Sequence, residues 1–362
     1  MQILVNEVRT MKRSCLFLTM LLAAALVSGC APQEEPEKSP AQPPATTGSG
    51  MHVTRTDEPV TLRVGYSTAA DDPRGVALES FREKVEKGTN GEVLIEIHPA
   101  GELGSDSELI AGMISGDVDM TVSSAGNYAL YATRIGVSAL PFLFEDFESA
   151  WEFIDSPLMT QLNYDLEDNN MHVLAYFDNG FRCVTTSEKV GPVEKVADMK
   201  GLIIRTPENQ IVMETMSALS ASPRSYPFSE LKEALKDGTF DAQENPIPVI
   251  YNSKLYEEQK YLSVTKHSYD AMPLTIRKDI WDTLPPEYQT VIANAALDAQ
   301  AQDRALVKEQ TESYVQKLED AGMEIVYPDL EPFRKATSGV KDMFSNVYGQ
   351  DLIEYIDTLQ SE

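Results

Sequence analysis

An arginine at the end of an apolar strand is the residue of this sequence that most directly suggests a chemical role. In KGLIIRTPEN (200–209), three aliphatic residues predict a buried strand that ends at Arg205, because Pro207 cannot extend a ladder. A guanidinium stays charged at every physiological pH. Arg205 therefore either reaches a carboxylate on the surface or points into a cleft and binds an anion.

Further polar or aromatic side chains follow apolar segments or begin helices, and these are Asn179, Arg182, Phe228, Glu244, Asn245 and His267. Taken singly, each has an ordinary structural interpretation. An arginine at a strand end forms a surface salt bridge, an aromatic residue packs in the core, and a histidine is buried and hydrogen-bonded. Glu244 would be a buried carboxylate with a partner in its own loop.

Motifs of the common enzyme classes are missing from the sequence. It has no phosphate-binding loop, no dinucleotide fingerprint, no His-Glu-x-x-His and no Gly-x-Ser-x-Gly. Its four histidines do not have the spacing of metal ligands. We therefore predict no catalytic residue, no metal and no cofactor. A lipoprotein hydrolase acting on acidic substrates remains the alternative from another class, and it would need a nucleophile or metal in the cleft.

The composition is that of a folded, acidic protein. The chain has 362 residues, 42% hydrophobic and 24% charged, which fits about two domains. Its formal net charge of −27 argues against a nucleic-acid partner, because phosphate binding needs basic patches. Solubility is the ordinary explanation of the acidity. On such a protein, an anion site needs local, fixed positive charge.

The first 60 residues predict export and a lipid anchor. A basic pair after Met11 precedes an apolar stretch at 15–27, and the segment Val27-Ser-Gly-Cys30 is typical of a lipoprotein signal peptide. We predict a signal peptide at 1–29, a lipidated Cys30 and a Pro-rich tether at 30–60. The protein would then be extracytoplasmic and held to a membrane. A plain secretory signal with a chance cysteine is the alternative, and Met1 or Met11 could be the true start.

Strands and helices alternate after this tether. The apolar pattern and capping signals predict strands at 61–66, 93–98, 119–124, 201–205, 262–264 and 274–276, and helices at 73–87, 105–115, 210–220 and 229–236. This alternation is typical of an open α/β sheet covered by helices. Two such units would enclose a cleft at the carboxyl ends of their strands. Cys183 is the one cysteine left outside the signal and lipid positions, so we expect no internal disulfide.

A stretch without glycine or proline, 287–321, predicts one long helix. At 1.5 Å per residue it would reach about 52 Å, enough to run across both units. We expect one lobe at 61–180 with 271–310 and a second at 181–270 with 311–338. A C-terminal helical segment would follow at 339–362.

Several motifs together give the chain from about 61 to 348 a family resemblance. It resembles the solute receptors of tripartite ATP-independent periplasmic (TRAP) transporters, the C4-dicarboxylate-binding (DctP-type) family. The motifs are PAGELGSDSELIAGMISGDVDM (99–120), LPFLFED (140–146), DNGFR (178–182), DMKGLIIRTPEN (198–209), SELKEALKDGTFDAQENP (229–246) and LYEEQKYLSVTKH (255–267). Their order and spacing are much more specific than any one motif. The resemblance implies a two-lobed periplasmic-binding-protein-like fold with a long helix spanning both lobes.

The resemblance also implies roles for the polar residues. Arg205 takes the position of the selectivity arginine, which pairs with the ligand carboxylate, and Arg182 that of a second arginine. Asn245 would close around the same carboxylate. Phe228 would pack on the ligand and His267 would stand at the polar rim.

Three residues of the first lobe stand where other members of the family meet the far end of the ligand. They are Ser67, Asp106 and Ser124. Their chemistry suits hydroxyl groups better than a second carboxylate, which favours a hydroxylated acid such as a uronate over a C4-dicarboxylate. The resemblance implies no chemical reaction, only capture by lobe closure and delivery to a membrane permease driven by an ion gradient. An ATP-driven receptor of the same architecture, or a purely structural lipoprotein, is the alternative; we expect a monomer.

Overall fold

The computed structural model describes residues 58–359. The predicted signal peptide, Cys30 and nearly all of the tether lie outside these residues. Within the described part of the chain, no helix combines the length and apolar character needed to cross a membrane.

Strands and helices alternate through the first half, as the sequence predicts. The elements are β1 (Val60–Gly65), α1 (Pro73–Gly88), β2 (Val93–His98), α2 (Asp106–Ser115), β3 (Met120–Val122), α3 (Ala125–Tyr128), η1 (Thr133–Ala139), α4 (Phe147–Ile154), α5 (Pro157–Glu167) and β4 (Met171–Thr186).

The second half continues the alternation and ends in helices. Its elements are η2 (Val196–Met199), β5 (Ile203–Thr206), α6 (Gln210–Ala218), β6 (Ser222–Ser225), η3 (Phe228–Glu230), α7 (Leu231–Lys236), β7 (Ala242–Pro246), α8 (Ile247–Asn252), η4 (Leu255–Glu257), β8 (Tyr261–Arg277), α9 (Lys278–Trp281), α10 (Pro286–Asp320), β9 (Glu324–Val326), α11 (Glu331–Thr337), α12 (Val340–Tyr348) and α13 (Gln350–Leu359).

Local signals explain the helices near the cleft. Asp72 caps α1, accepting a hydrogen bond from the backbone of Arg74, and Pro73 takes the first helical position. Ser105 and Glu108 form the predicted capping box of α2, and Gly116 ends this helix in the left-handed conformation. Both helices follow the carboxyl end of a strand. Their N-termini therefore lie at one edge of the sheet.

One sheet runs through the described residues, in the order β2-β1-β3-β8-β4-β7-β5-β6, with β9 also paired to β8. Strands β4 and β8 pair antiparallel along most of their length and connect the β2-β1-β3 group to the β7-β5-β6 group. The prediction of two separate strands at 262–264 and 274–276 is wrong. Both belong to the 17-residue β8, which is interrupted by an irregularity near Lys266, where φ is +42°.

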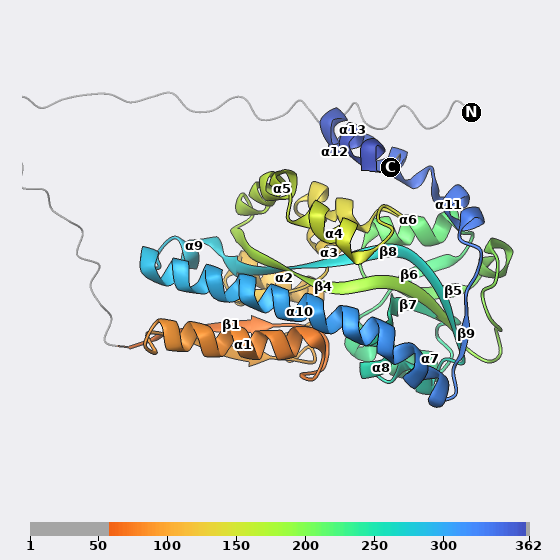
Figure 1. Cartoon of the computed structure of the whole chain (residues 1–362), viewed down its shortest axis with the longest axis horizontal. Helices are drawn as coiled ribbons and strands as arrows, with labels where there is room; N and C mark the ends of the chain where they lie inside the picture. The colour runs from red at the N-terminus through yellow and green to blue at the C-terminus, as the bar shows by residue number, and fades with distance from the viewer. Residues whose placement is uncertain (1–57, 360–362) are drawn as a thin grey trace, which may run out of the picture. The chain divides into compact units, whose positions relative to one another are not determined.

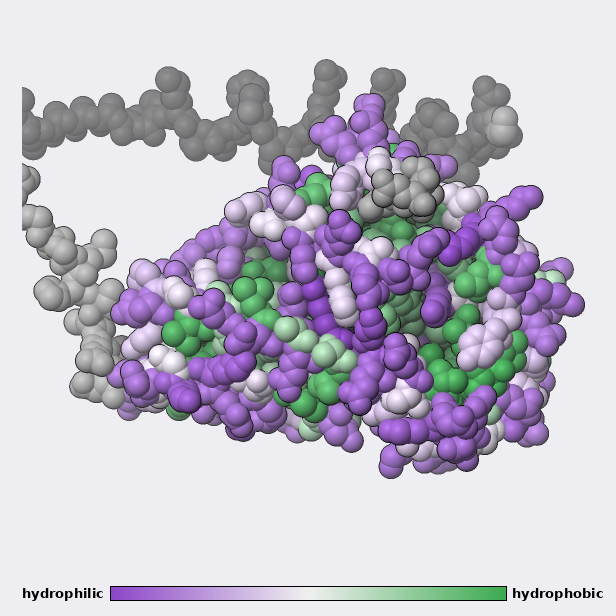
Figure 2. Space-filling view, in the orientation of Figure 1, coloured by the Kyte–Doolittle hydropathy of each residue, from purple (hydrophilic) through white to green (hydrophobic). Residues whose placement is uncertain are grey.

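Helix α10 confirms the prediction of one long helix at 287–321. It has 35 residues and runs along β4 and α1 (Figure 1). Small and aliphatic side chains such as Ala295, Ala299 and Val307 are buried on one face. On the side of the molecule that carries α10, hydrophilic residues cover most of the surface, as the acidic composition predicts (Figure 2).

The predicted lobe boundaries fall inside the elements that connect the two strand groups. Gly180 of β4 and Asp270 of β8 are register partners in the sheet, and they stand at the predicted boundaries 180/181 and 270/271. The third boundary, 310/311, lies within α10. Division into lobes at these residues stays a prediction. Below, lobe I and lobe II denote the two predicted sets of residues.

Candidate functional site

Two adjoining cavities form a cleft between the lobe I and lobe II residues. Both are lined by Asp106, Asn127, Arg205, Pro207 and Phe228. The structure brings seven of the eight predicted ligand-binding residues to these walls: Ser67, Asp106, Ser124, Arg182, Arg205, Phe228 and Asn245. His267 is the exception.

Arg205 lies in β5 with its guanidinium aimed into this cleft. Its Nε and Nη2 donate hydrogen bonds to the backbone oxygen of Tyr226, at 2.9 and 2.6 Å, and the Phe228 ring lies 5.7 Å away. The residue is 3% exposed, and no ion pair involves it among the residues that the structure describes. Burial lowers the pKa of Arg205 to about 10, so it stays cationic at neutral pH. A buried cation without a carboxylate partner carries a desolvation cost that a bound anion would offset.

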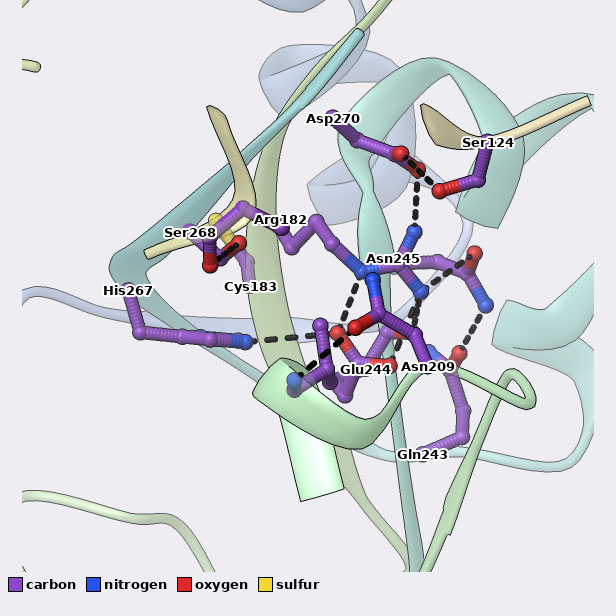
Figure 3. A network of polar contacts seen from close by, with 12 residues as sticks. Ser124, Arg182, Cys183, Asn209, Gln243, Glu244, Asn245, His267, Ser268 and Asp270 are labelled. Carbon is purple, nitrogen blue, oxygen red and sulfur yellow. Dashed lines mark hydrogen bonds and ion pairs between the residues drawn. The ribbon is translucent and has the colours of Figure 1, made fainter. Parts of the chain in front are cut away.

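Arg182 lies in the same cleft, but its charge is already matched. Its Nε donates to Glu244 Oε2 at 2.5 Å, and its Nη1 donates to Asp270 Oδ2 at 2.5 Å (Figure 3). Burial alone would lower the pKa of Arg182, but the carboxylates of Glu244 and Asp270 outweigh this effect and raise it. Arg182 of β4 thus links this strand to β7 and β8 and offers the ligand little uncompensated charge.

Glu244 and His267 form the buried end of this network. Burial would raise the pKa of Glu244, yet Arg182 and His267 together lower it, so the carboxylate stays ionised. His267 Nε2 lies 3.3 Å from Glu244 Oε2, and its Nδ1 lies 2.8 Å from the Thr265 hydroxyl. The expectation that His267 stands at a polar rim is wrong. The residue is fully buried within β8, where it supports Glu244.

Asn245 lines the cleft beside Arg182. Its Nδ2 donates to Gln243 Oε1 at 2.6 Å, and its Oδ1 accepts from Arg182 Nη2 at 3.3 Å (Figure 3). Both partners come from strands that pair in the sheet, β4 and β7. The amide is therefore held in one orientation on the cleft wall.

Lobe I contributes side chains from the ends of β1 and β3 and from the start of α2. Ser124 donates to Asp270 Oδ1 at 2.5 Å, and Ser67 is 8% exposed. Asp106, the first residue of α2, lines both cavities and forms no ion pair among the described residues. These three residues are thus near the cleft, as the resemblance implies.

Several cleft residues were not predicted to bind the ligand. Arg74, Thr68, Asn127, Asn179 and Asp270 line one or both cavities. A usable signal existed for Arg74, because the Asp72-Pro73 pair marks a helix start directly after a strand, where ligands often bind. Asn179 lies in the DNGFR motif but has no local feature that distinguishes a cleft residue from a structural one.

Lobe I and lobe II residues meet at one side of the cleft. The Ser107 hydroxyl donates to Glu208 Oε2 at 2.6 Å. A Cβ atom added to Gly126 would lie 1.6 Å from the Nδ2 atom of Asn209. The Gly126 backbone therefore touches the residue that caps α6, so the two sets of residues are in direct contact at this side of the cleft.

The described residues offer neither a metal-ligand cluster nor an activated thiol. Among residues 58–358, no group of three or more histidine, cysteine, aspartate or glutamate side chains could hold a metal ion. Cys183, free and buried, has its pKa raised to about 11 by burial, which makes a thiolate nucleophile unfavourable. The site has the features of a binding cleft.

A two-sided α/β cleft with an unpaired arginine defines the chain as a solute-binding protein of the periplasmic-binding-protein type. Residues 64–346 match the family described as "Bacterial extracellular solute-binding protein, family 7", and the chain belongs to this family. It is an extracytoplasmic receptor for a solute and not an enzyme.

Relatives with assigned functions bind organic acids. The chain is 35% identical over 306 residues to the 2,3-diketo-L-gulonate-binding periplasmic protein YiaO of Escherichia coli, covering 83% of this chain and 92% of that protein. It is 28% identical to the C4-dicarboxylate-binding periplasmic protein DctP of Rhodobacter capsulatus, covering 84% and 92%.

Solved structures confirm the fold. A TRAP periplasmic solute-binding protein from a Polaromonas species, bound to D-erythronate, aligns with a TM-score of 0.79 and 32% identity over 83% of this chain and 98% of that one. The sugar-acid-binding protein DctPAm of Advenella mimigardefordensis, in complex with galactonate, aligns with a TM-score of 0.80 and 30% identity, covering 84% and 99%.

Proposed function

We propose that this chain captures a sugar acid by its carboxylate and delivers it to a TRAP-type membrane permease. The observation that carries the proposal is the unpaired, buried guanidinium of Arg205 in the cleft. A planar guanidinium can bind a carboxylate through two parallel hydrogen bonds, and exclusion of water strengthens the pair. Sugar acids are favoured because the relatives named above bind a diketo-gulonate, an erythronate and a galactonate.

The ligand is expected to lie between Arg205 and the lobe I wall. Phe228 would pack on its carbon chain, since this ring stands beside Arg205 and lines both cavities. Asn245, Ser67 and Ser124 would supply polar contacts. Arg182 would contribute mainly by holding Asn245 in place and by linking β4 to β7 and β8.

A thermal-shift screen tests the proposal. The domain from about residue 51 onward is mixed with sugar acids, C4-dicarboxylates, amino acids and neutral sugars. A ligand at about a thousand times its dissociation constant should add roughly 4 kcal/mol of stability. Only carboxylates should raise the melting temperature, and Arg205→Ala should abolish the rise while the fold is retained. Equal shifts with neutral sugars, or normal binding by Arg205→Ala, would contradict the proposal.

The lipid anchor is a second part of the proposal, and it concerns residues outside the described range. The signal peptide of residues 1–29 would be removed and Cys30 would carry the lipid, holding a monomeric receptor at the membrane through the tether of residues 30–60. Fractionation of cells that express the full chain tests this. The wild-type receptor should sediment with membranes, and Cys30→Ser should release it; an equal distribution of both would contradict the anchor.

A further inference from the structure

The lobe I end of the cleft contains a third buried arginine. Arg74, in the first turn of α1, is 3% exposed and lines the cavity together with Arg182 and Arg205. A cleft with three arginines would at first suggest a ligand with more than one carboxylate. Whether the cleft can bind more than one carboxylate depends on which of these arginines already have a carboxylate partner.

The charge of Arg74 is used within the protein. Its Nε donates to Asp72 Oδ1 at 3.0 Å, and both side chains are about 4% exposed. Its Nη2 donates to Asn179 Oδ1 at 3.0 Å, and Asn179 in turn donates to Asp270 at 2.8 Å. Arg74 is therefore a neutralised donor that can still hydrogen-bond a ligand, but it is not a free cation.

Acidic groups balance two of the three arginines in the cleft. Asp72 matches Arg74, while Glu244 and Asp270 match Arg182. Arg205 alone among these three arginines has no carboxylate partner within residues 58–358. Of these three arginines, only Arg205 is thus available to form an ion pair with a ligand carboxylate.

Asp106 adds an unpaired negative charge to the same cavity. It lines the wall near Arg74 and forms no ion pair in the described part of the chain. A second carboxylate at this end of the ligand would face Asp106, and like charges repel, the more strongly the less water lies between them. A hydroxyl group would instead donate a hydrogen bond to the Asp106 carboxylate.

Two buried polar atoms at this end also lack partners. Thr68 Oγ1 and Asn127 Oδ1 have no hydrogen-bond partner in the structure, and their residues are 3% and 2% exposed. Both residues line the cavity next to Asp106. An amide oxygen can only accept, so a carboxylate, which can only accept as well, would leave it unsatisfied, whereas a hydroxyl group would satisfy it.

We infer that this receptor selects acids with a single carboxylate and rejects the matching diacids, with Asp106 as the specificity-determining residue. The inference rests on the proposed function and narrows it. Arg205 takes the one carboxylate, and the lobe I end binds the hydroxyl-bearing end of the chain. A C4-dicarboxylate is then a poor ligand despite the name of the wider family.

Matched pairs of acids test the inference by isothermal titration calorimetry. Each pair differs only in the terminal carbon, which is a hydroxymethyl group or a carboxylate: galactonate with galactarate, gluconate with glucarate, and erythronate with meso-tartrate. For each pair that binds, the monoacid should have a dissociation constant at least tenfold lower. A diacid that binds as tightly as its monoacid would overturn the inference.

Three variants test which residue causes the preference for monoacids over diacids. In Asp106→Asn the preference for the monoacid should shrink at least tenfold, because the repulsion is removed. Asp168→Asn is the matched control, since it removes the same charge at the exposed end of α5, away from the cleft, and it should leave the preference unchanged. If Arg74→Gln, rather than Asp106→Asn, changes the discrimination by selectively weakening the diacid, Arg74 binds a second carboxylate and the inference is wrong.

Failure of the inference is distinguishable from failure of the proposed function. If no acid binds, or if Arg205→Ala binds acids normally, the proposed function itself falls. If acids bind through Arg205 but monoacid and diacid bind equally, only the single-carboxylate selectivity falls. Melting curves of each ligand-free variant show that the fold is retained.

Discussion

The Glu244 carboxylate accepts two hydrogen bonds from the Arg182 guanidinium, at 2.5 and 2.8 Å, in a fully buried pair. Arg205, in the same cleft, has no such partner within the described residues. Two arginines that look equivalent in sequence therefore have opposite relationships to stability. One is neutralised within the fold, and the other is an unpaired buried charge whose cost the proposed ligand carboxylate would offset.

Replacement of these arginines should separate the two roles. Arg182→Ala leaves Glu244 and Asp270 buried without their cation, so the free energy of unfolding should fall by about 3–5 kcal/mol. Arg205→Met removes an unpaired buried cation, so the ligand-free protein should gain roughly 1–3 kcal/mol. Urea unfolding of both variants measures the difference. Equal destabilisation by both changes would mean that Arg205 is a structural residue.

Closure of the cleft should depend on the absence of a side chain at Gly126. A Cβ atom there would lie 1.6 Å from Asn209 Nδ2. Asn209 is held in place because its Oδ1 accepts hydrogen bonds from the backbone of Ile211 and Val212. Gly126→Ala should therefore hinder closure and raise the ligand dissociation constant at least tenfold.

Gly339→Ala is the matched control for this change, because no atom lies within 4 Å of the added Cβ and its φ of −80° is ordinary. Calorimetric titration with the best acid from the screen measures both variants. Unchanged affinity in Gly126→Ala, with a normal melting curve, would show that the ligand binds without this contact.

Asp178 should make stability depend on pH between about 4 and 6. Burial raises its pKa to about 6, although Trp151 and the Gly180 backbone donate to its carboxylate at 2.7 and 2.6 Å. A carboxyl group whose pKa is higher in the folded state contributes most stability below its ordinary pKa, near 4. That contribution is lost as the pH rises through 6.

Asp178→Asn removes this titration. The stability of the variant relative to the wild type should therefore increase by up to about 3 kcal/mol between pH 4 and pH 7. Denaturant unfolding of both proteins at several pH values in that range measures this difference in stability. The contributions of the other carboxyl groups cancel in it, because both proteins contain them. A difference that stays constant over the range would show that Asp178 is not titrating there.

Asp303 faces Asp178 from α10 and accepts a hydrogen bond from its backbone, so the Asp303→Asn variant tests which carboxyl group is responsible.

Much of the fold could be predicted because local signals and tertiary structure agree. The capping box at Ser105, the Asp72-Pro73 helix start and the uninterrupted stretch of α10 each need no distant partner to be recognised. Strand β8 could not be predicted as one element. The residues around Lys266 break its apolar pattern, and only pairing with β4 carries the strand across this irregularity.

The sequence predicted most of the residues that line the cleft, but it did not predict their ion pairs. Arg182 and Arg205 both follow apolar segments in the sequence, and nothing near them in sequence shows that Glu244 and Asp270 match only the first. His267 was misplaced for the same reason. Its burial follows from a contact with Glu244, which is 23 residues away in the chain.

Helix α10 has a mechanical consequence. It runs for 35 residues with no glycine or proline after its first position, and it packs along β4 and α1. A helix without such a break bends as a whole, like an elastic rod, since sharp kinks need proline, glycine or an inserted group. Opening of the cleft would then strain α10 gradually along its length. The ligand-free receptor would adopt the conformation in which α10 is least bent. Ligand binding would then have to supply only the free-energy difference between this conformation and the closed one.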